Sequence, residues 1–426
     1  MLAYPVRTVS DRAMPASALL PPRAWRTVGL LWFVACFNYL ARVMLTTMHG
    51  SMVEAIPMTE AQFGLLSSVF LWIYALLNPI AGFVSDRFSR SRVITISIFI
   101  WSVLTLLTGY ARTFEQLLIM RALMGVSESC YFPAALALIT EYHRGPTRSR
   151  AIGLHMSGLL AGAMAAGWCG WLAEARGWTF PFTLVGAVGV AYSLVLVIGL
   201  RDAPARAEAP PAGAIARPGV SFGDAIASLL GSRSFLIIFT FCGLVGAVGY
   251  AVLGWMPTYL HEHFHLRQGQ AGVSATAYLY AAEFTGILIG GMWADRWSRT
   301  RTGACVLVLA VGYSVAAPGV FLAGHTGLLA LAILGLVLWG LANGFSDSNL
   351  MPSICLVTDS RYRATAYGLT NMAAAGAGGL AIYGVGLLRD RHFDFGQMLT
   401  LAAAVIVFGP FLLLLIKPRP EPPGAG

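Results

Sequence analysis

The chain has 426 residues, of which 57% are hydrophobic and only 11% are charged, and its mean hydropathy is +0.70. Soluble globular domains carry about 25% charged residues, so this composition excludes an ordinary soluble protein and indicates one that crosses a membrane many times. The net charge of +9 does not predict a nucleic-acid partner, because the basic residues fall in short segments between apolar stretches.

Twelve apolar stretches are long enough to cross the roughly 30 Å hydrocarbon layer as helices. These stretches are 25–48, 62–85, 93–111, 115–140, 150–172, 179–200, 234–257, 271–293, 303–323, 327–352, 363–388 and 395–416. They are apolar on every face and do not alternate as the strands of a membrane barrel do. The expected fold class is therefore an all-α membrane protein with twelve transmembrane helices.

The basic residues concentrate in both terminal segments, in residues 201–233 and in alternate loops, which by the positive-inside rule places both termini in the cytoplasm. The expected organisation is a tail (1–24), a first six-helix bundle (25–200), a linker (201–233), a second six-helix bundle (234–416) and a tail (417–426). The end of the linker, SFGDAIASLLGS, is expected to form a short helix along the membrane surface.

Three sequence echoes indicate that the two bundles are homologous. GFVSDRFSRSR (82–92) follows the second stretch, and GMWADRWSRTR (291–301) follows the eighth. GVSESCYFP (125–133) matches GFSDSNLMP (344–352), which pairs Glu128 with Asp347. RSRA at 148 and RYRA at 361 then open the next stretches in the same order.

The duplicated G-x-x-x-D-R-x-x-R pattern resembles the signature of the major facilitator superfamily, over roughly residues 25–416. The resemblance implies two bundles that rock around a central site, transport rather than enzyme activity, and no cofactor. The two copies are expected to clasp and release the cytoplasmic side during transport; the alternative is that their charges only anchor the topology. The expected gating residues are Gly82, Asp86, Arg87, Arg90, Gly291, Asp295, Arg296 and Arg299.

Ionisable side chains inside membrane spans are costly and usually functional. Arg42 and Arg121 are expected at similar depth in the outer half, with Glu128 near the midplane. Guanidinium groups bind carboxylates in a planar, bidentate manner, and a desolvated carboxyl group can exchange protons, so these residues suggest uptake of an organic anion with protons. The alternative is that Arg121 and Glu128 merely pair, with the counter-ion of Arg42 coming from another helix or from a ligand.

Two further carboxyl groups lie in the second half. Glu283 is expected to face the central cavity, because a position facing lipid would be costly. Asp347 is expected to be a relay or gate, with a cap on a bend near Pro352 as the alternative. Glu128, Glu283 and Asp347 are therefore the expected proton-coupling residues.

Within the superfamily, FNYLAR (37–42), RALMGVSESCYFPAA (121–135) and YGLTNM (367–372) resemble the anion:cation symporter group. The resemblance implies that Arg42, with Asn38, Tyr39 and Asn371, holds the substrate carboxylate while Glu128 takes the proton. The group carries an aspartate before its helix 1 arginine, where this chain has Ala41. That difference removes one protonatable group and the natural partner of Arg42.

The expected function is secondary transport of a small organic anion, a carboxylate or sugar acid, by proton symport. The expected location is the inner membrane, with the proton gradient as energy source and a monomer as the working unit. Exporters of amphiphiles, of the spinster-like or multidrug type, are the main alternative, and a membrane sensor is a lesser one. The six cysteines lie singly in apolar stretches, so no metal site is expected.

Overall fold

The computed structural model consists of long helices that run side by side. It describes residues 22–143, 147–203, 222–301, 303–359 and 361–417, and it leaves the side chains at 22, 79, 82–86 and 222 undescribed. Most of the two expected tails and the middle of the expected linker lie outside these residues. By length and composition, 11 of the described helices, or 12 when one bent pair counts as a single span, can cross a membrane. The expected all-α membrane fold is confirmed.

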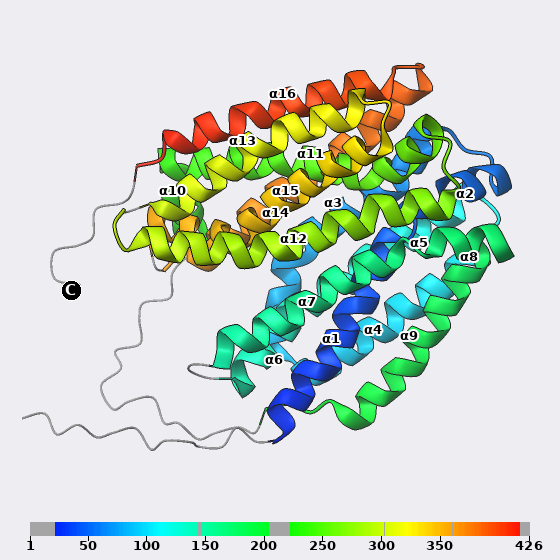
Figure 1. The fold of residues 1–426 in the computed structure, drawn as a ribbon. Helices are drawn as coiled ribbons and strands as arrows, with labels where there is room; N and C mark the ends of the chain where they lie inside the picture. The colour runs from blue at the N-terminus through cyan, green and yellow to red at the C-terminus, as the bar shows by residue number, and fades with distance from the viewer. Residues whose placement is uncertain (1–21, 144–146, 204–221, 302, 360, 418–426) are drawn as a thin grey trace, which may run out of the picture.

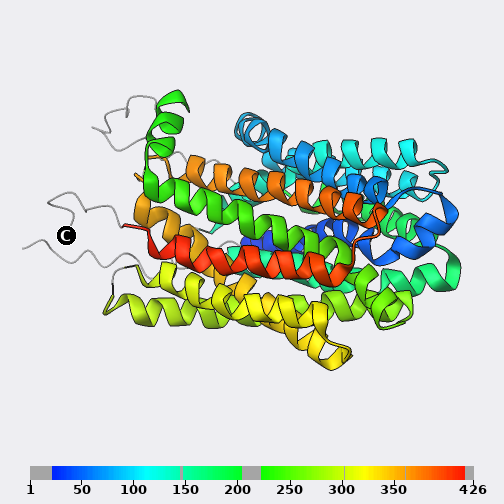
Figure 2. The same cartoon turned by 90° about the horizontal axis from the view of Figure 1, so that it is seen from above.

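The first half contains the helices α1 (Pro22–Val43), α2 (His49–Ala55), α3 (Glu60–Arg87), α4 (Arg90–Thr108), α5 (Phe114–Ser129), α6 (Tyr131–Tyr142), α7 (Arg148–Ala166), α8 (Cys169–Arg176) and α9 (Thr179–Gly199), with a 3₁₀ turn η1 (Thr46–Met48) before α2. The second half contains α11 (Arg233–His263), α12 (Gln268–Ser298), α13 (Ala304–His325), α14 (Leu329–Val357), α15 (Arg363–Asp390) and α16 (Phe395–Leu414). The expected linker helix is α10 (Phe222–Leu230), which packs on α11 and α15 and lies crosswise to the long helices (Figure 2).

Two predicted spans are broken next to the residues of interest. The first span ends as α1 at Val43 and bends by 43° into the turn and α2, which leaves Arg42 in the last turn of α1. The fourth span divides at Cys130 into α5 and α6. Pro133 explains this break, because a proline has no N–H to donate to the carbonyl of Ser129. Glu128 therefore lies at the end of α5.

Glycines let helices within each half meet backbone to backbone. A Cβ atom on Gly162 of α7 would overlap the carbonyl oxygen of Cys36 in α1, and one on Gly344 of α14 would overlap the carbonyl oxygen of Glu283 in α12. Small residues at such crossings are typical of membrane helix pairs, whose cohesion comes from packing. These contacts fix α1 against α7 and α12 against α14, and thereby position Arg42 and Glu283.

Replacing Gly162 with alanine is expected to destabilise the protein by about 1–3 kcal/mol, the usual cost of overpacking a tight core. Gly153 in the same helix is the matched control, since a Cβ there meets nothing within 4 Å. Gly153→Ala is expected to be neutral or slightly stabilising, because alanine favours helices. Thermal unfolding of the purified variants in detergent measures both effects, and equal melting temperatures would contradict the crossing.

The two halves meet at one end of the molecule and separate toward the other (Figure 1). We call the end that carries α10 the linker end and the end that carries α2 and α8 the far end. Hydrogen bonds between the halves join α3 to α15, and α2 and α8 to α12. Among the described residues, the bond nearest the linker end runs from Trp72 to the carbonyl of Gly376. This conformation is therefore closed at the far end.

Candidate functional site

Arg42 forms an ion pair with Glu128, one nitrogen of its guanidinium lying 3.0 Å from Glu128 Oε2. The Glu128 side chain is fully buried, whereas the Arg42 side chain is 12% exposed to solvent. The counter-ion of Arg42 thus comes from another helix, α5. The expected alternative, a pair between Arg121 and Glu128, is not what the structure shows.

Three aromatic rings surround the Arg42 guanidinium. Its Cζ lies 5.0 Å from the ring centre of Tyr39, 4.8 Å from Phe70 and 4.8 Å from Tyr74. Such cation–π contacts stabilise a cation most where water is excluded. The rings and Glu128 together hold the guanidinium in one place while leaving part of it exposed.

Among the described residues, three buried polar atoms beside this ion pair have no hydrogen-bond partner. They are Asn38 Nδ2, Arg42 Nε and Glu128 Oε1. Asn38 is adjacent to Glu128 but does not form a well-aligned bond with it. Unpaired buried polar atoms are costly, so this cluster has unused capacity for a proton, a water molecule or a ligand group.

Arg121 does not share the exposed position of Arg42. It is only 2% exposed, its Nε donates to the carbonyl of Leu66 at 3.3 Å, and its Cζ lies 5.0 Å from the Phe70 ring. Among the described residues it forms no salt bridge, although Glu128 is within electrostatic range. Arg121 was expected to bind the anion together with Arg42, but in this conformation it offers almost no surface to a substrate.

The carboxyl groups of Glu283 and Asp347 of the second half are close enough to interact electrostatically. Glu283 is partly buried and Asp347 is exposed. In the described part of the chain neither carboxyl forms a salt bridge. The alternative for Asp347, a cap on a bend at Pro352, fits poorly because α14 continues through that proline.

The two sites face each other across the interface of the halves. Tyr39 of the first half lies within electrostatic range of Glu283 and Tyr250 of the second half. Tyr250 in turn lies within electrostatic range of Arg42 and Asp347. Asn371 is exposed on α15, where it approaches Tyr367. Sequence reasoning missed Phe70, Tyr74 and Tyr250, since an aromatic residue in an apolar helix looks like ordinary core.

The duplicated motifs lie at the linker end. Arg90 pairs with Glu141 at the end of α6, within the first half. Asp295, Arg296 and Arg299 are exposed, and none of the three forms a salt bridge among the described residues. The side chains of Gly82 and Asp86 lie outside the described residues, and Arg87 is exposed. A clasp between the two copies remains a prediction for the conformation closed at this end.

Two details of this region refine the prediction. Gly290, not Gly291, makes the close contact: a Cβ on Gly290 would lie 2.8 Å from the Phe345 ring, whereas one on Gly291 would be 3.8 Å from Ser348.

Asp202, after α9, accepts hydrogen bonds from the Ser91 N–H at 2.7 Å and from the Ser89 hydroxyl. Partial burial alone would raise the pKa of Asp202, but these hydrogen bonds outweigh it and lower the pKa.

The family model of the Major Facilitator Superfamily matches residues 31–382. The chain belongs to this superfamily. A probable sulfoacetate transporter of Cupriavidus necator is 27% identical over 406 residues, 91% of this chain and 92% of that protein. A probable galactarate/D-glucarate transporter of Escherichia coli K12 is 28% identical over 330 residues, 70% of this chain and 71% of that protein. These relatives agree with the resemblance to the anion:cation symporter group.

A solved structure shares the fold of this superfamily member. It is that of a bacterial homologue of the human lysosomal transporter spinster, in an inward-facing and unoccupied conformation. The TM-score is 0.76 at 21% sequence identity, with 94% of this chain and 96% of that chain covered. The expected fold of two homologous six-helix bundles is confirmed, and the protein is a multi-pass membrane transporter rather than an enzyme.

Proposed function

We propose that this facilitator transports a small organic anion, a carboxylate or sugar acid, together with protons by alternating access. The observation that carries the proposal is the Arg42 guanidinium, which is partly exposed, held in place by three aromatic rings, and within electrostatic range of Tyr250 of the second half. An oriented guanidinium suits the planar, bidentate recognition of a carboxylate or another oxyanion. The names of the two relatives, a probable sulfoacetate transporter and a probable galactarate/D-glucarate transporter, support this class of cargo.

Glu128 supplies the link to protons in this proposal. An incoming anion and Glu128 compete for the same guanidinium, since Arg42 is the salt-bridge partner of Glu128. A carboxylate left buried without its cation is strongly destabilised, and binding a proton relieves that cost. Anion binding to Arg42 is therefore coupled to proton uptake by Glu128.

In this proposal, Glu283 and Asp347 replace the protonatable group that the first helix lacks, since Ala41 stands where the symporter group has an aspartate. Two neighbouring carboxyl groups repel each other when both are ionised, so one shared proton stabilises the pair. Their place across the interface from Arg42 separates the proposed second proton site from the anion site. We further propose that the transporter works as a monomer in the inner membrane with the linker end in the cytoplasm.

A ligand screen on the purified protein tests the proposed substrate class. A ligand that binds only the folded state at 100 times its Kd stabilises it by about 2.7 kcal/mol. Galactarate and sulfoacetate are the anionic probes, galactitol is the uncharged control, and a lysophospholipid represents amphiphile export. Stabilisation by an anion but not by galactitol is expected; stabilisation by the lysophospholipid alone would favour the exporter.

A further inference from the structure

At the far end, a residue of the second half caps a helix of the first. Asp390, the last residue of α15, accepts hydrogen bonds from the first two N–H groups of α3: its Oδ1 from Glu60 at 2.8 Å and its Oδ2 from Ala61 at 3.1 Å. The first N–H groups of a helix have no acceptor within it, and negative charge is favourable at its N-terminus. Asp390 meets both requirements from 330 residues away.

Arg389 adds an ion pair beside this cap. Its Nε donates to Glu60 Oε2 at 3.0 Å, across the halves, while its two terminal nitrogens donate to Glu262 of its own half at 3.1 and 2.8 Å. The bidentate bond to Glu262 orients the guanidinium, and so does the Phe395 ring, 4.4 Å from its Cζ. Arg389 is thus held in place by its own half and reaches across to the other with one bond.

The other polar contacts at this end are weaker in kind. Gln268 of α12 exchanges hydrogen bonds with Ser51, and the Gly269 N–H donates to Glu174. The bonds of Gln268 join neutral groups, and the Glu174 carboxylate accepts a single N–H at 3.3 Å. Asp390, by contrast, accepts two N–H bonds at 2.8 and 3.1 Å, and the bond from Arg389 to Glu60 joins two charged groups. Hydrogen bonds that involve charged groups are roughly twice as strong as neutral ones. The charged contacts of Glu60, Arg389 and Asp390 are therefore the main polar connection between the halves at the far end.

We propose that Glu60, Arg389 and Asp390 form a latch that holds the far end closed in this conformation and opens when the halves rock. Alternating access requires the far end to separate, and these contacts cannot persist when α3 and α15 part there. The latch is partly exposed, since the Glu60 side chain is 24% exposed to solvent and the Arg389 side chain is 11% exposed. Water can therefore replace each bond, which makes the latch reversible.

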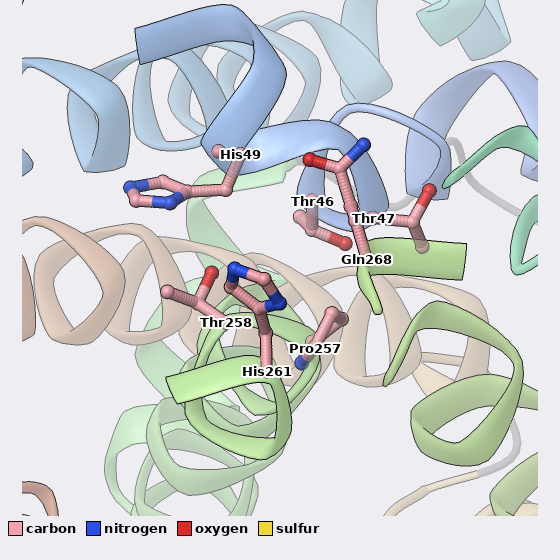
Figure 3. Close-up of a pocket in the computed structure, with 8 residues that line it drawn as sticks. Thr46, Thr47, His49, Pro257, Thr258, His261 and Gln268 are labelled. Carbon is pink, nitrogen blue, oxygen red and sulfur yellow. The ribbon is translucent and has the colours of Figure 1, made fainter. Parts of the chain in front are cut away.

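Thr258 of α11 provides a probe of this seam. It is 3% exposed, and its hydroxyl has no hydrogen-bond partner in the part of the chain that the structure describes. It lines a small pocket between the halves, with His49 of the first half on the opposite side (Figure 3). A cysteine at this position is buried while the far end is closed and becomes reactive when it opens. Thr258→Cys in a background with the six native cysteines replaced, reconstituted in nanodiscs, therefore reports opening as its rate of maleimide labelling.

Arg389→Gln and Asp390→Ala are each expected to speed the labelling of Thr258→Cys at least several-fold. Glu60→Gln removes the charged partner that the first half contributes to the latch, and it is also expected to speed labelling. Arg391→Gln is the matched control: it removes an exposed cation two residues from Arg389 that forms no salt bridge among the described residues, so labelling is expected to change little. Melting curves identify variants that are folded.

Unchanged labelling rates in the folded latch variants would overturn the proposal. An equal acceleration by Arg391→Gln would overturn it too, because the effect would then follow from any loss of charge near Arg389. No substrate enters the measurement, so its outcome is independent of the anion and proton sites proposed above.

Discussion

Arg42→Ala is expected to abolish binding of the transported anion while the protein remains folded. Hydrogen bonds to a charged group contribute about 1.5–3 kcal/mol each, so losing a bidentate contact weakens binding by at least roughly a hundredfold, at 1.4 kcal/mol per factor of ten. Binding of the anion identified in the ligand screen, measured by calorimetry on the purified variant, gives the affinity.

The design of this test follows from the Glu128 ion pair. Removing Arg42 alone leaves a buried carboxyl without its cation, which can cost 3–5 kcal/mol of stability. The double variant Arg42→Ala with Glu128→Gln removes both charges and keeps the test valid if the single variant does not fold. Arg42→Lys is a further comparison, since it retains the charge but lacks the planar fork. Unchanged affinity in a folded variant without Arg42 would refute the anion site.

Glu128→Gln is expected to eliminate proton-driven accumulation of the anion while retaining exchange of the anion across the membrane. Glutamine keeps the size of the side chain but cannot change its protonation state, so Arg42 stays available at every pH. Uptake into proteoliposomes with and without an imposed pH gradient measures accumulation, and counterflow without a gradient measures exchange.

Two controls separate coupling from damage. Glu283→Gln tests the proposed second proton site and is expected to change the pH dependence of accumulation without loss of anion binding. Loss of both counterflow and accumulation in Glu128→Gln would indicate a structural role instead. Accumulation that persists at the original level would exclude Glu128 as a coupling residue.

Most of the fold was predictable because each span is a continuous apolar run and the repeat is written in the sequence. The breaks were harder to predict: the bend after Val43 and the division at Cys130 lie inside apolar runs, where hydropathy is unchanged. Pro133 signalled the second break, because a proline removes a backbone donor. For the bend after Val43, the sequence contains no comparable proline.

The site was predictable in its members but not in its partners. Arg42 and Glu128 stood out because charge is rare in membrane helices, yet their pairing across 86 residues depends on how α1 and α5 pack. For the same reason, the sequence did not indicate that the Arg121 side chain is buried against the carbonyl of Leu66. Glu60, Arg389 and Asp390 lie at the ends of helices, where charged residues are common and attract no notice.

The duplicated helix crossings have a consequence for engineering. Gly125 packs on the backbone of Phe70, and Gly344 packs on the backbone of Glu283, so both halves share one scaffold at this point. Three residues further on, Glu128 meets an arginine, whereas Asp347 meets a second acid. An artificial chimera built from two copies of either half would retain the packing but place identical chemistry on both walls. Such a symmetric protein would lack either the basic or the acidic wall. The two halves are therefore not interchangeable, even though their helices pack in the same way.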